Sequence, residues 1–191
     1  MITHSTVKKP LKRIGYLIIG VWFIACSALI TWYSTSNKNE FDPNMQLSQA
    51  IMDMSFEQTF SQLLITVKPE QTGNARIIHF TQGDCYCEWL AEPHQNKLDE
   101  WALKHEFNAI YIDLKDFPQL QQYIPSTPAI AAIDDNNQLI YLGPYSRGSG
   151  CFSQSGEVDI QLNNYLMMKQ TNKLGINALI DTDASGCYCN T

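Results

Sequence analysis

The sequence lacks the short motifs that mark several large enzyme classes. Its 191 residues contain no G-x-x-x-x-G-K-[ST] phosphate loop, no G-x-G-x-x-G dinucleotide fingerprint and no H-E-x-x-H zinc pair. The nucleotide-binding and zinc-protease classes are therefore disfavoured. The sequence also has no methionine-rich stretch, and its four histidines are scattered along the chain. Both absences weigh against a copper-binding module.

Basic residues are scarce after the first 34 positions. Those 34 residues carry four basic side chains and no acidic one, a charge of +4. The other 157 residues hold 9 Lys and Arg against 19 Asp and Glu, a charge of −10. Because so acidic a body repels a phosphate backbone, we expect no nucleic-acid partner. With 45% hydrophobic and 17% charged residues the chain is not of the disordered class, and its length fits one domain plus an extension.

One long hydrophobic run lies near the N-terminus. Ile14 to Tyr33 contain no charged residue over 20 positions, about the length that crosses a bilayer core. The basic residues precede this run, and cationic segments stay on the cytoplasmic face of a membrane. We therefore expect a cytoplasmic segment at residues 1–13, a transmembrane helix at 14–33, and a body on the far side of the membrane.

Two processing events compete with an uncleaved anchor. A secretory signal is cut after a small-x-small site, and a lipoprotein signal is cut before a cysteine that becomes lipidated. The segment Phe23 to Cys26 resembles the second kind of site only loosely, because Phe23 replaces the usual leucine and the apolar run continues past Cys26. We favour the uncleaved anchor. All three alternatives leave the body outside the cytoplasm.

Hydrophobic periodicity divides the body into a linker and helical extension at 34–73, a mixed α/β domain at 74–171 and a tail at 172–191. Within the domain the pattern predicts strands at 75–81, 108–114, 129–133 and 139–142, and helices around Pro93, at 117–124 and at 158–168. The last two strands form a hairpin. Trp89 is expected to pack in the core or against a helix, and His94 to be solvated.

This order of elements resembles the thioredoxin superfamily over about residues 75–169. The features that carry the resemblance are Cys85 and Cys87 at the position of the redox cysteines, Thr127-Pro128 at the position of the cis-proline, and Gly143 beside the expected active site. The resemblance implies a thioredoxin-like α/β fold, a mixed central sheet flanked by helices, with a cis-proline loop that holds a peptide. The whole chain is also similar to a family of bacterial thioredoxin-like proteins that carry a second C-x-C at the C-terminus.

Two positions depart from the thioredoxin pattern. The cysteines form C-x-C and not C-x-x-C, so only one of them can lie fully at a helix N-terminus, where a thiolate is stabilised. His79 stands six residues before Cys85, where the family often has a buried acid that relays protons. His79 could be a proton shuttle for the resolving thiol or a strand histidine bonded to a backbone carbonyl, and we favour the second role.

Five cysteines follow the hydrophobic run, and an oxidising compartment favours disulfides between them. They are Cys85, Cys87, Cys151, Cys187 and Cys189. Closing a core-to-tail loop of about 100 residues contributes about 4.7 kcal/mol to stability, whereas a Cys85–Cys87 ring contributes about 1.6 kcal/mol before strain. A core-to-tail bond is thus the better staple and a C-x-C bond the better oxidant. The spacing leaves the pairing open.

Thiol–disulfide exchange is the function that we favour from the sequence. In this hypothesis Cys85 attacks a protein or small-molecule disulfide, Cys87 resolves the mixed disulfide, and Thr127-Pro128 holds the substrate. Cys187 and Cys189 act as an internal electron shuttle, with Cys151 and His79 as further candidates. We expect no resident cofactor and no metal for this reaction, and an electron-donating membrane partner whose identity the sequence does not give.

Two other functions stay open. One is a non-enzymatic scaffold in which every disulfide is structural, because a fold alone does not establish an activity. The other is a soft-metal module, in which the two C-x-C pairs and Cys151 hold Cu(I). For all three functions, the similarity to bacterial proteins implies an inner-membrane anchor and a periplasmic body.

Overall fold

The hydrophobic run folds as one continuous helix. In the computed structural model of the chain, α1 extends over Lys9–Ser36. Within it, Ile14–Trp32 is long and apolar enough to cross a membrane, and it is the one such helix among the described residues. Its apolar side chains are exposed, as those of Leu17 and Trp22 illustrate. A surface of this kind suits a helix surrounded by lipid.

The chain divides into two units, residues 1–37 and 38–191. The structure describes residues 9–36, 39–69, 73–83, 85–147, 157–171 and 178–191. The helical extension, the α/β domain and the tail expected from the sequence therefore share one unit.

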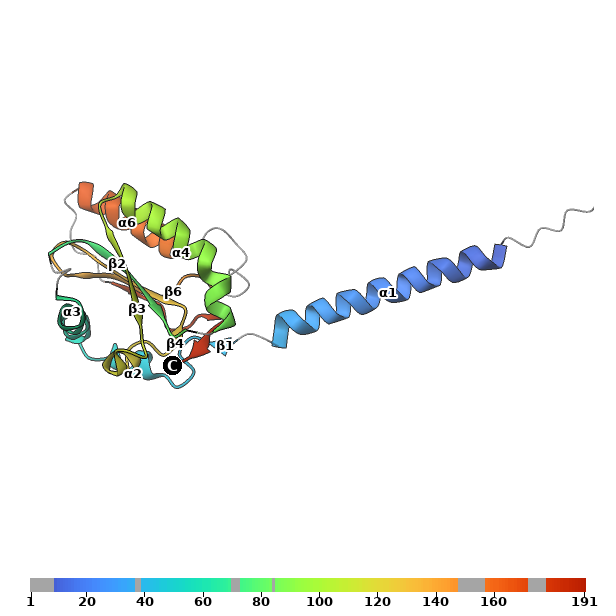
Figure 1. Cartoon of the computed structure of the whole chain (residues 1–191), viewed down its shortest axis with the longest axis horizontal. Coiled ribbons are helices and arrows are strands. Elements are labelled where there is room, and N and C mark those ends of the chain that lie inside the picture. The colour runs from blue at the N-terminus through green and yellow to red at the C-terminus, as the bar shows by residue number, and fades with distance from the viewer. Residues whose placement is uncertain (1–8, 37–38, 70–72, 84, 148–156, 172–177) are drawn as a thin grey trace, which may run out of the picture. The chain divides into compact units, whose positions relative to one another are not determined.

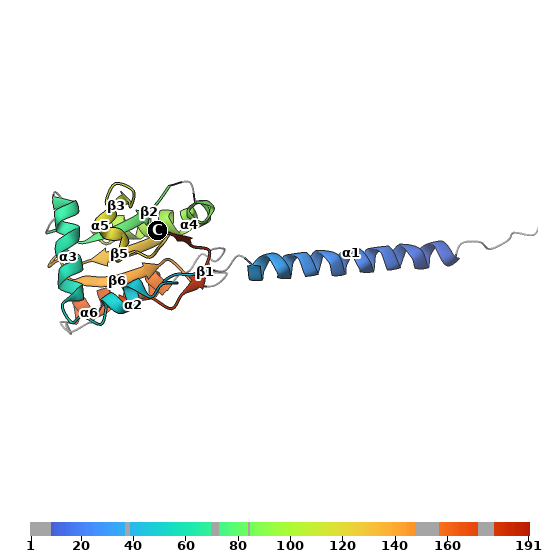
Figure 2. The same cartoon turned by 90° about the horizontal axis from the view of Figure 1, so that it is seen from below.

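A five-stranded mixed sheet forms the centre of the second unit (Figures 1 and 2), with the order β3-β2-β5-β6-β7. The strands are β2 (Arg76–Thr81), β3 (Asn108–Asp113), β5 (Ala129–Ile133), β6 (Leu139–Pro144) and β7 (Leu179–Ile180). β2 pairs parallel with β3 and antiparallel with β5, and β5 pairs antiparallel with β6. The short β7 pairs parallel with β6, so the tail supplies one edge of the central sheet.

Helices cover both faces of this sheet. They are α2 (Gln46–Ala50), α3 (Phe56–Val67), α4 (Tyr86–Lys104), α5 (Pro118–Gln121) and α6 (Glu157–Gln170). α4 and α6 lie on one face, and α2, α3 and α5 lie on the other (Figures 1 and 2). Successive residues of a strand point to opposite faces, so Ile77 joins the core beneath α4 and α6 while Ile78 and Phe80 join the core beneath α3.

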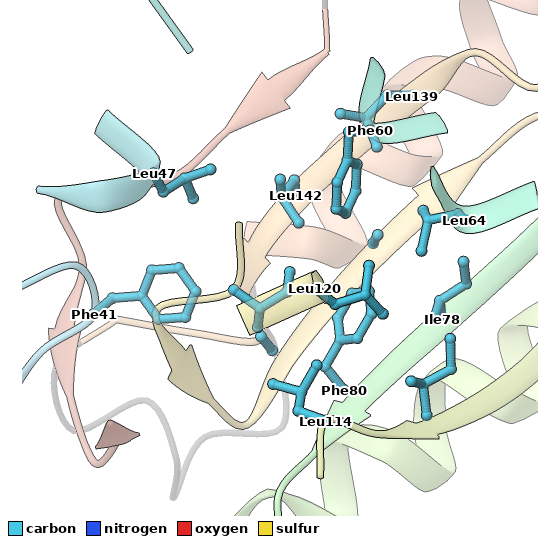
Figure 3. Close-up of a cluster of buried hydrophobic side chains, with 14 of the residues drawn as sticks. Phe41, Leu47, Phe60, Leu64, Ile78, Phe80, Leu114, Leu120, Leu139 and Leu142 are labelled. Carbon is cyan, nitrogen blue, oxygen red and sulfur yellow. The ribbon is translucent and has the colours of Figure 1, made fainter. Parts of the chain in front are cut away.

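The larger core lies on the α3 face (Figure 3). Phe60 and Leu64 of α3 are buried there against Ile78 and Phe80 of β2. Phe41 and Tyr188 belong to the same cluster, so the N-terminal extension and the tail are both anchored in this core.

Two short two-stranded sheets hold the tail against the rest of the unit. β1 (Asn39–Glu40) pairs antiparallel with β8 (Ser185–Gly186). β4 (Ser126–Thr127) pairs antiparallel with β9 (Cys189–Asn190). These pairings bring residues far apart in the sequence to the N-terminal end of α4, where the candidate site lies.

The hairpin between β5 and β6 forms at the expected turn. Asp134 Oδ1 accepts hydrogen bonds from the backbone N–H of Asn136, at 2.9 Å, and of Gln138, at 2.8 Å. Asn137 takes the left-handed conformation, with φ of 62°. Asp and Asn are favoured at such positions because their side chains replace backbone partners and tolerate positive φ.

Candidate functional site

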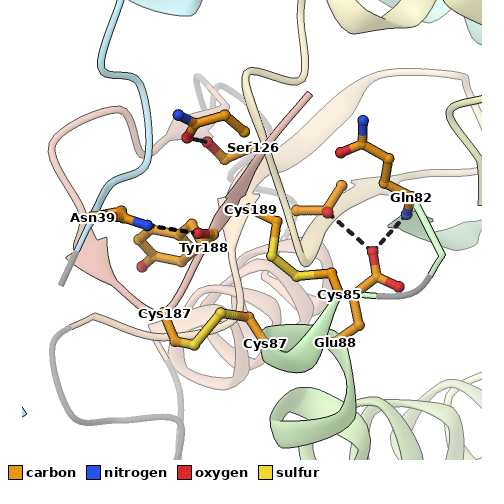
Figure 4. Close-up of a disulfide and its surroundings, with 11 residues drawn as sticks. Asn39, Gln82, Cys85, Cys87, Glu88, Ser126, Cys187, Tyr188 and Cys189 are labelled. Atoms are coloured by element: carbon orange, nitrogen blue, oxygen red, sulfur yellow. Dashed lines mark hydrogen bonds between the residues drawn. A yellow bond between two sulfur atoms is a disulfide. The ribbon is translucent and has the colours of Figure 1, made fainter. Parts of the chain in front are cut away.

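The structure joins the two C-x-C pairs to each other (Figure 4). Cys85 is bonded to Cys189, with 6.4 Å between their Cα atoms. Cys87 is bonded to Cys187, with 5.4 Å between their Cα atoms. Both bonds run from core to tail across 104 and 100 residues. The C-x-C pair of the tail therefore lies against the C-x-C pair of the core, although about 100 residues separate them in the sequence.

The core pair lies at the start of α4. Cys85 is the N-cap residue, with extended backbone, and Cys87 lies in the first turn. Cys87 is 8% exposed and contributes to the buried face of the helix, whereas Cys85 and both tail cysteines are partly exposed. The positive end of the helix dipole at this position favours a thiolate in a reduced cysteine.

The β4 strand carries the tail as an added strand. Thr127 is paired with Cys189, and Ser126 with Asn190. Beyond this ladder, the backbone N–H of Thr191 donates to the Pro125 carbonyl at 3.1 Å. The bond Thr127-Pro128 is cis, and both residues of β4 are fully buried. The tail thus occupies the strand edge next to Cys85.

Tyr188, between the two tail cysteines, is the side chain that anchors this segment. It is 3% exposed, and its hydroxyl donates to the Ser146 carbonyl at 2.8 Å. Its ring meets the ring of Phe41 edge-on, with 5.4 Å between centroids. Asn39 Nδ2 donates to the Tyr188 carbonyl at 3.0 Å (Figure 4). The N-terminal extension therefore binds the tail directly, with no sulfur involved.

A further contact holds the tail where β7 joins the sheet. Asp181 is nearly buried and accepts two hydrogen bonds from Arg147, at 2.9 and 2.7 Å. A bidentate pair of this kind fixes both side chains. Gly143 lies opposite, and a Cβ added there would come within 2.8 Å of the Asp181 Cβ. The glycine that the sequence matched to an active-site position therefore permits the close approach of the tail.

Glu88 links the helix to the strands that surround the cysteines. Its Oε1 accepts hydrogen bonds from the Gln82 backbone N–H and from Thr127 Oγ1, the latter at 3.0 Å (Figure 4). A carboxylate in the first turn is favoured by the helix dipole. The same negative charge opposes formation of a thiolate at the neighbouring cysteines. Glu88 therefore links α4 to β2 and β4, and its charge would oppose a thiolate once the disulfides are reduced.

His79 is completely buried in β2 and hydrogen-bonded by two side chains rather than by a backbone carbonyl. Its Nδ1 contacts the Tyr145 hydroxyl, and its Nε2 lies 3.1 Å from Asp99 Oδ1. Tyr111 donates to the other oxygen of Asp99 at 2.8 Å. Burial disfavours the imidazolium and, against the attraction of Asp99, lowers the pKa of His79 to about 4. His79 is therefore neutral near pH 7. As a candidate proton carrier it would accept a proton before it could donate one.

Two sequence expectations near the site are wrong. His94, expected to be solvated, is 5% exposed and lies near the Tyr145 ring. It follows Ala91 by three residues and precedes Leu98 by four, so the helical spacing could have placed it on the buried face. Trp89, expected to pack, is 65% exposed. Its ring lies 5.7 Å from that of Tyr86, which is also exposed.

One candidate residue cannot be placed, and some contacts of the site were not predicted. Cys151 lies outside the described residues. Sequence reasoning did not find Asp99 and Tyr145 as partners of His79, because one lies on α4 and the other follows β6, and no motif marks them.

No curated protein matches this chain. A solved structure, described as a hypothetical protein SMc02350 from Sinorhizobium meliloti 1021, is similar at 13% identity, over 65% of this chain and 82% of that chain, with a TM-score of 0.42. The family model described as "Domain of unknown function (DUF6436)" matches residues 54–191. Because that match covers well over half of the sequence, the chain belongs to the DUF6436 family.

Proposed function

We propose that this protein is a membrane-anchored, thioredoxin-like protein that carries out thiol–disulfide exchange through its two C-x-C pairs. The observation that carries the proposal is the position of Cys189. It is bonded to Cys85 at the start of α4 and paired in a strand ladder with Thr127, next to Pro128. This is the arrangement of a mixed disulfide between a helix cysteine and an extended peptide, here formed within one chain.

The topology supports a thioredoxin-like fold. β2 and β3 are parallel and are connected through α4, and β5 and β6 form an antiparallel hairpin beside β2. α6 then returns to the face that α4 covers (Figure 1). The strand order β3-β2-β5-β6 and the cysteine-bearing start of α4 agree with the resemblance found in the sequence.

The exchange reaction starts from the reduced pair. The Cys85 thiolate attacks a sulfur of the substrate disulfide, a Cys85–substrate bond forms, and the other substrate sulfur leaves as a thiolate that takes up a proton. The Cys189 thiolate, which lies next to Cys85, then attacks Cys85 Sγ and releases the second substrate thiol. The substrate gains two electrons and two protons, which the two cysteines lose. Cys189 thus takes the resolving role first assigned to Cys87.

The docked tail restricts the substrates. Because β9 occupies the edge of β4, an extended peptide cannot add to that strand while the tail is bound. The partly exposed residues Cys85 and Cys189 would remain accessible to small disulfides and to cysteines on exposed protein surfaces. With α1 in an inner membrane and its basic end in the cytoplasm, the reaction would take place in the periplasm.

A structural scaffold is the second candidate, and the connectivity favours it specifically. Both disulfides join core to tail, and each closes a loop of about 100 residues, which the chain-entropy relation makes an effective staple. Cys87 is buried, as structural cysteines usually are. In this case the fold would serve a partner-binding role with no exchange.

One experiment separates the two candidates. The full chain in detergent is assayed for reduction of a small chromogenic disulfide in the presence of a dithiol, and its bonds are mapped before and after by non-reducing mass spectrometry. We expect turnover that is lost in Cys85→Ser and retained in the matched control Cys26→Ser. If both disulfides stay intact under the dithiol while the wild-type chain shows no turnover, the scaffold is the correct function.

A further inference from the structure

Three sulfur atoms form a cluster at the N-terminal end of α4. The Sγ atoms of Cys85, Cys87 and Cys189 all lie within 4.8 Å of one another. When the disulfides are reduced, these sulfurs become thiols, and thiolates are ligands that select soft metal ions. We propose that the reduced protein binds one Cu(I) ion through Cys85, Cys87 and Cys189. This site goes beyond the proposed exchange reaction, although it uses the same sulfurs.

Contacts without sulfur keep these ligands together. The ladder between β4 and β9 places Cys189 opposite Thr127, and the Thr191 hydroxyl donates to the Ile124 carbonyl at 2.8 Å. Tyr188, the next residue before Cys189, is buried against Phe41. A tail docked in this way stays on the core after the disulfides open. The metal therefore meets ligands that are already gathered, and little ordering entropy opposes binding.

The ligand set favours Cu(I) over harder ions. Structural zinc sites take four ligands in a tetrahedron. The mutually close set has three sulfurs, those of Cys85, Cys87 and Cys189, and thiolates select soft ions such as Cu(I). Glu88, in the same helical turn, already accepts hydrogen bonds at Oε1 from Gln82 and Thr127. The cluster therefore offers a soft, sulfur-only site.

The two disulfides must be reduced before the metal can bind. Each disulfide takes up two electrons and two protons from an external reductant, a phosphine in the experiment below, so the two disulfides yield four thiols. Binding of Cu(I) to Cys85, Cys87 and Cys189 releases three protons and leaves a site of charge −2. The positive end of the α4 dipole offsets part of that charge. Copper binding and the core-to-tail disulfides exclude each other.

The test uses the full chain in detergent, reduced with a phosphine, desalted without oxygen and titrated with Cu(I) as its acetonitrile complex. A chromophoric Cu(I) chelator competes for the metal, and thiolate-to-copper absorption in the ultraviolet reports on the ligands. We expect about one Cu(I) per chain to be withheld from the chelator. The oxidised protein should withhold none, because its sulfurs are bonded to each other.

Variants assign the ligands. Replacing an outer-shell partner typically lowers metal affinity about 10- to 100-fold, so loss of a direct ligand in Cys189→Ser should exceed the lower end of that range. Cys187→Ser should change the affinity less than Cys189→Ser does. Cys26→Ser, in α1, is the matched control and should bind copper as the wild-type chain does. Amide hydrogen exchange of the reduced protein should show β9 still protected.

Three results overturn the proposal: reduced protein that yields all its Cu(I) to the chelator, Cys189→Ser that binds as tightly as wild type, or a β9 that loses its protection on reduction. The exchange assay is run without metal, so a failed copper site and a failed exchange function are told apart. Turnover without copper binding would remove this inference alone. Copper binding without turnover would remove the exchange function alone.

Discussion

The two disulfides have similar sequence separations, but their cysteines lie in different surroundings. They span 104 and 100 residues and connect the same two segments. Cys85–Cys189 joins two partly exposed residues at the N-cap of α4 and on the edge strand β9, whereas Cys87–Cys187 has one end on the buried face of the helix. The two bonds close loops of similar length but differ in the exposure of the residues that they join. We therefore expect an incoming thiolate to reach the first bond more readily, because the second bond has the buried Cys87 at one end.

The loops of the two bonds are nested, which makes their contributions to stability non-additive. Either bond alone closes a loop of about 100 residues, worth about 4.7 kcal/mol. Once one bond exists, the other closes a ring of only about six residues, worth about 2.2 kcal/mol by the same relation. Each bond is thus a partial substitute for the other.

Removing both bonds gives the largest expected effect. The double variant Cys187→Ser, Cys189→Ser should lower the free energy of unfolding by about 7 kcal/mol, whereas either single variant should lower it by about 2 kcal/mol. Denaturant unfolding of the full chain in detergent measures both values, with Cys26→Ser as control. Equal steps for the first and second bond removed would contradict the nested loops.

The non-covalent anchor of the tail gives the next effect. Tyr188→Ala should cost about 3–5 kcal/mol, because it leaves a cavity beside Phe41 and removes the hydroxyl that binds the Ser146 carbonyl. Tyr188→Phe keeps the ring and should cost about 1 kcal/mol. Thermal unfolding of the oxidised proteins compares them. Equal stability of the two variants would mean that packing of the Tyr188 ring does not anchor the tail.

Burial of His79 makes the free energy of unfolding depend on pH. His79 has its pKa lowered to about 4 by burial, while the unfolded chain titrates near 6.5. The unfolded state therefore binds the proton first, and stability is full above pH 6.5 and falls by about 1.4 kcal/mol per unit until about pH 4. The facing groups are Asp99, Tyr145 and Tyr111, whose ring stacks on the imidazole with 4.6 Å between centroids. His79→Gln should flatten this slope in pH-dependent unfolding, even where its overall stability is lower.

The order of reduction tests the difference in access directly. A mild dithiol should open Cys85–Cys189 about tenfold faster than Cys87–Cys187, because only the first bond has partly exposed sulfur-bearing residues at both ends. Timed alkylation followed by mass spectrometry measures both rates on one sample. Simultaneous opening would show that burial of Cys87 gives no protection.

The smallest expected effect comes from charge at the helix start. Glu88→Gln keeps the acceptor for Gln82 and Thr127 and removes the negative charge. The thiolate fraction of Cys85, and with it the exchange rate near pH 7, should rise about two- to tenfold. The pH profile of alkylation of the reduced protein measures it, with the more distant Glu92→Gln as matched control on the same helix. An unchanged profile would mean that Glu88 does not act on the thiol through its charge.

The sequence predicts four of the five central strands because local patterns determine them, but it does not predict β7, which the tail supplies. The strand at Ala129 to Ile133 and the turn at Asp134 both follow from apolar runs and turn residues. The meeting of the two C-x-C pairs could be suspected from their repetition, but not their pairing, because it depends on β9 adding to β4. The His79 network was missed for the same reason. Its partners come from α4, β3 and the end of β6, and periodicity does not report contacts between elements.

The connectivity also imposes an order of maturation. Cys85 and Cys87 leave the ribosome about 100 residues before Cys187 and Cys189, and chains begin to fold from the N-terminal side as they are made. An oxidant that acted on the emerging chain would join the first two cysteines to each other. The native pairing therefore requires that their oxidation wait for the tail or be reshuffled afterwards, so biogenesis of this protein depends on when its thiols meet an oxidising catalyst.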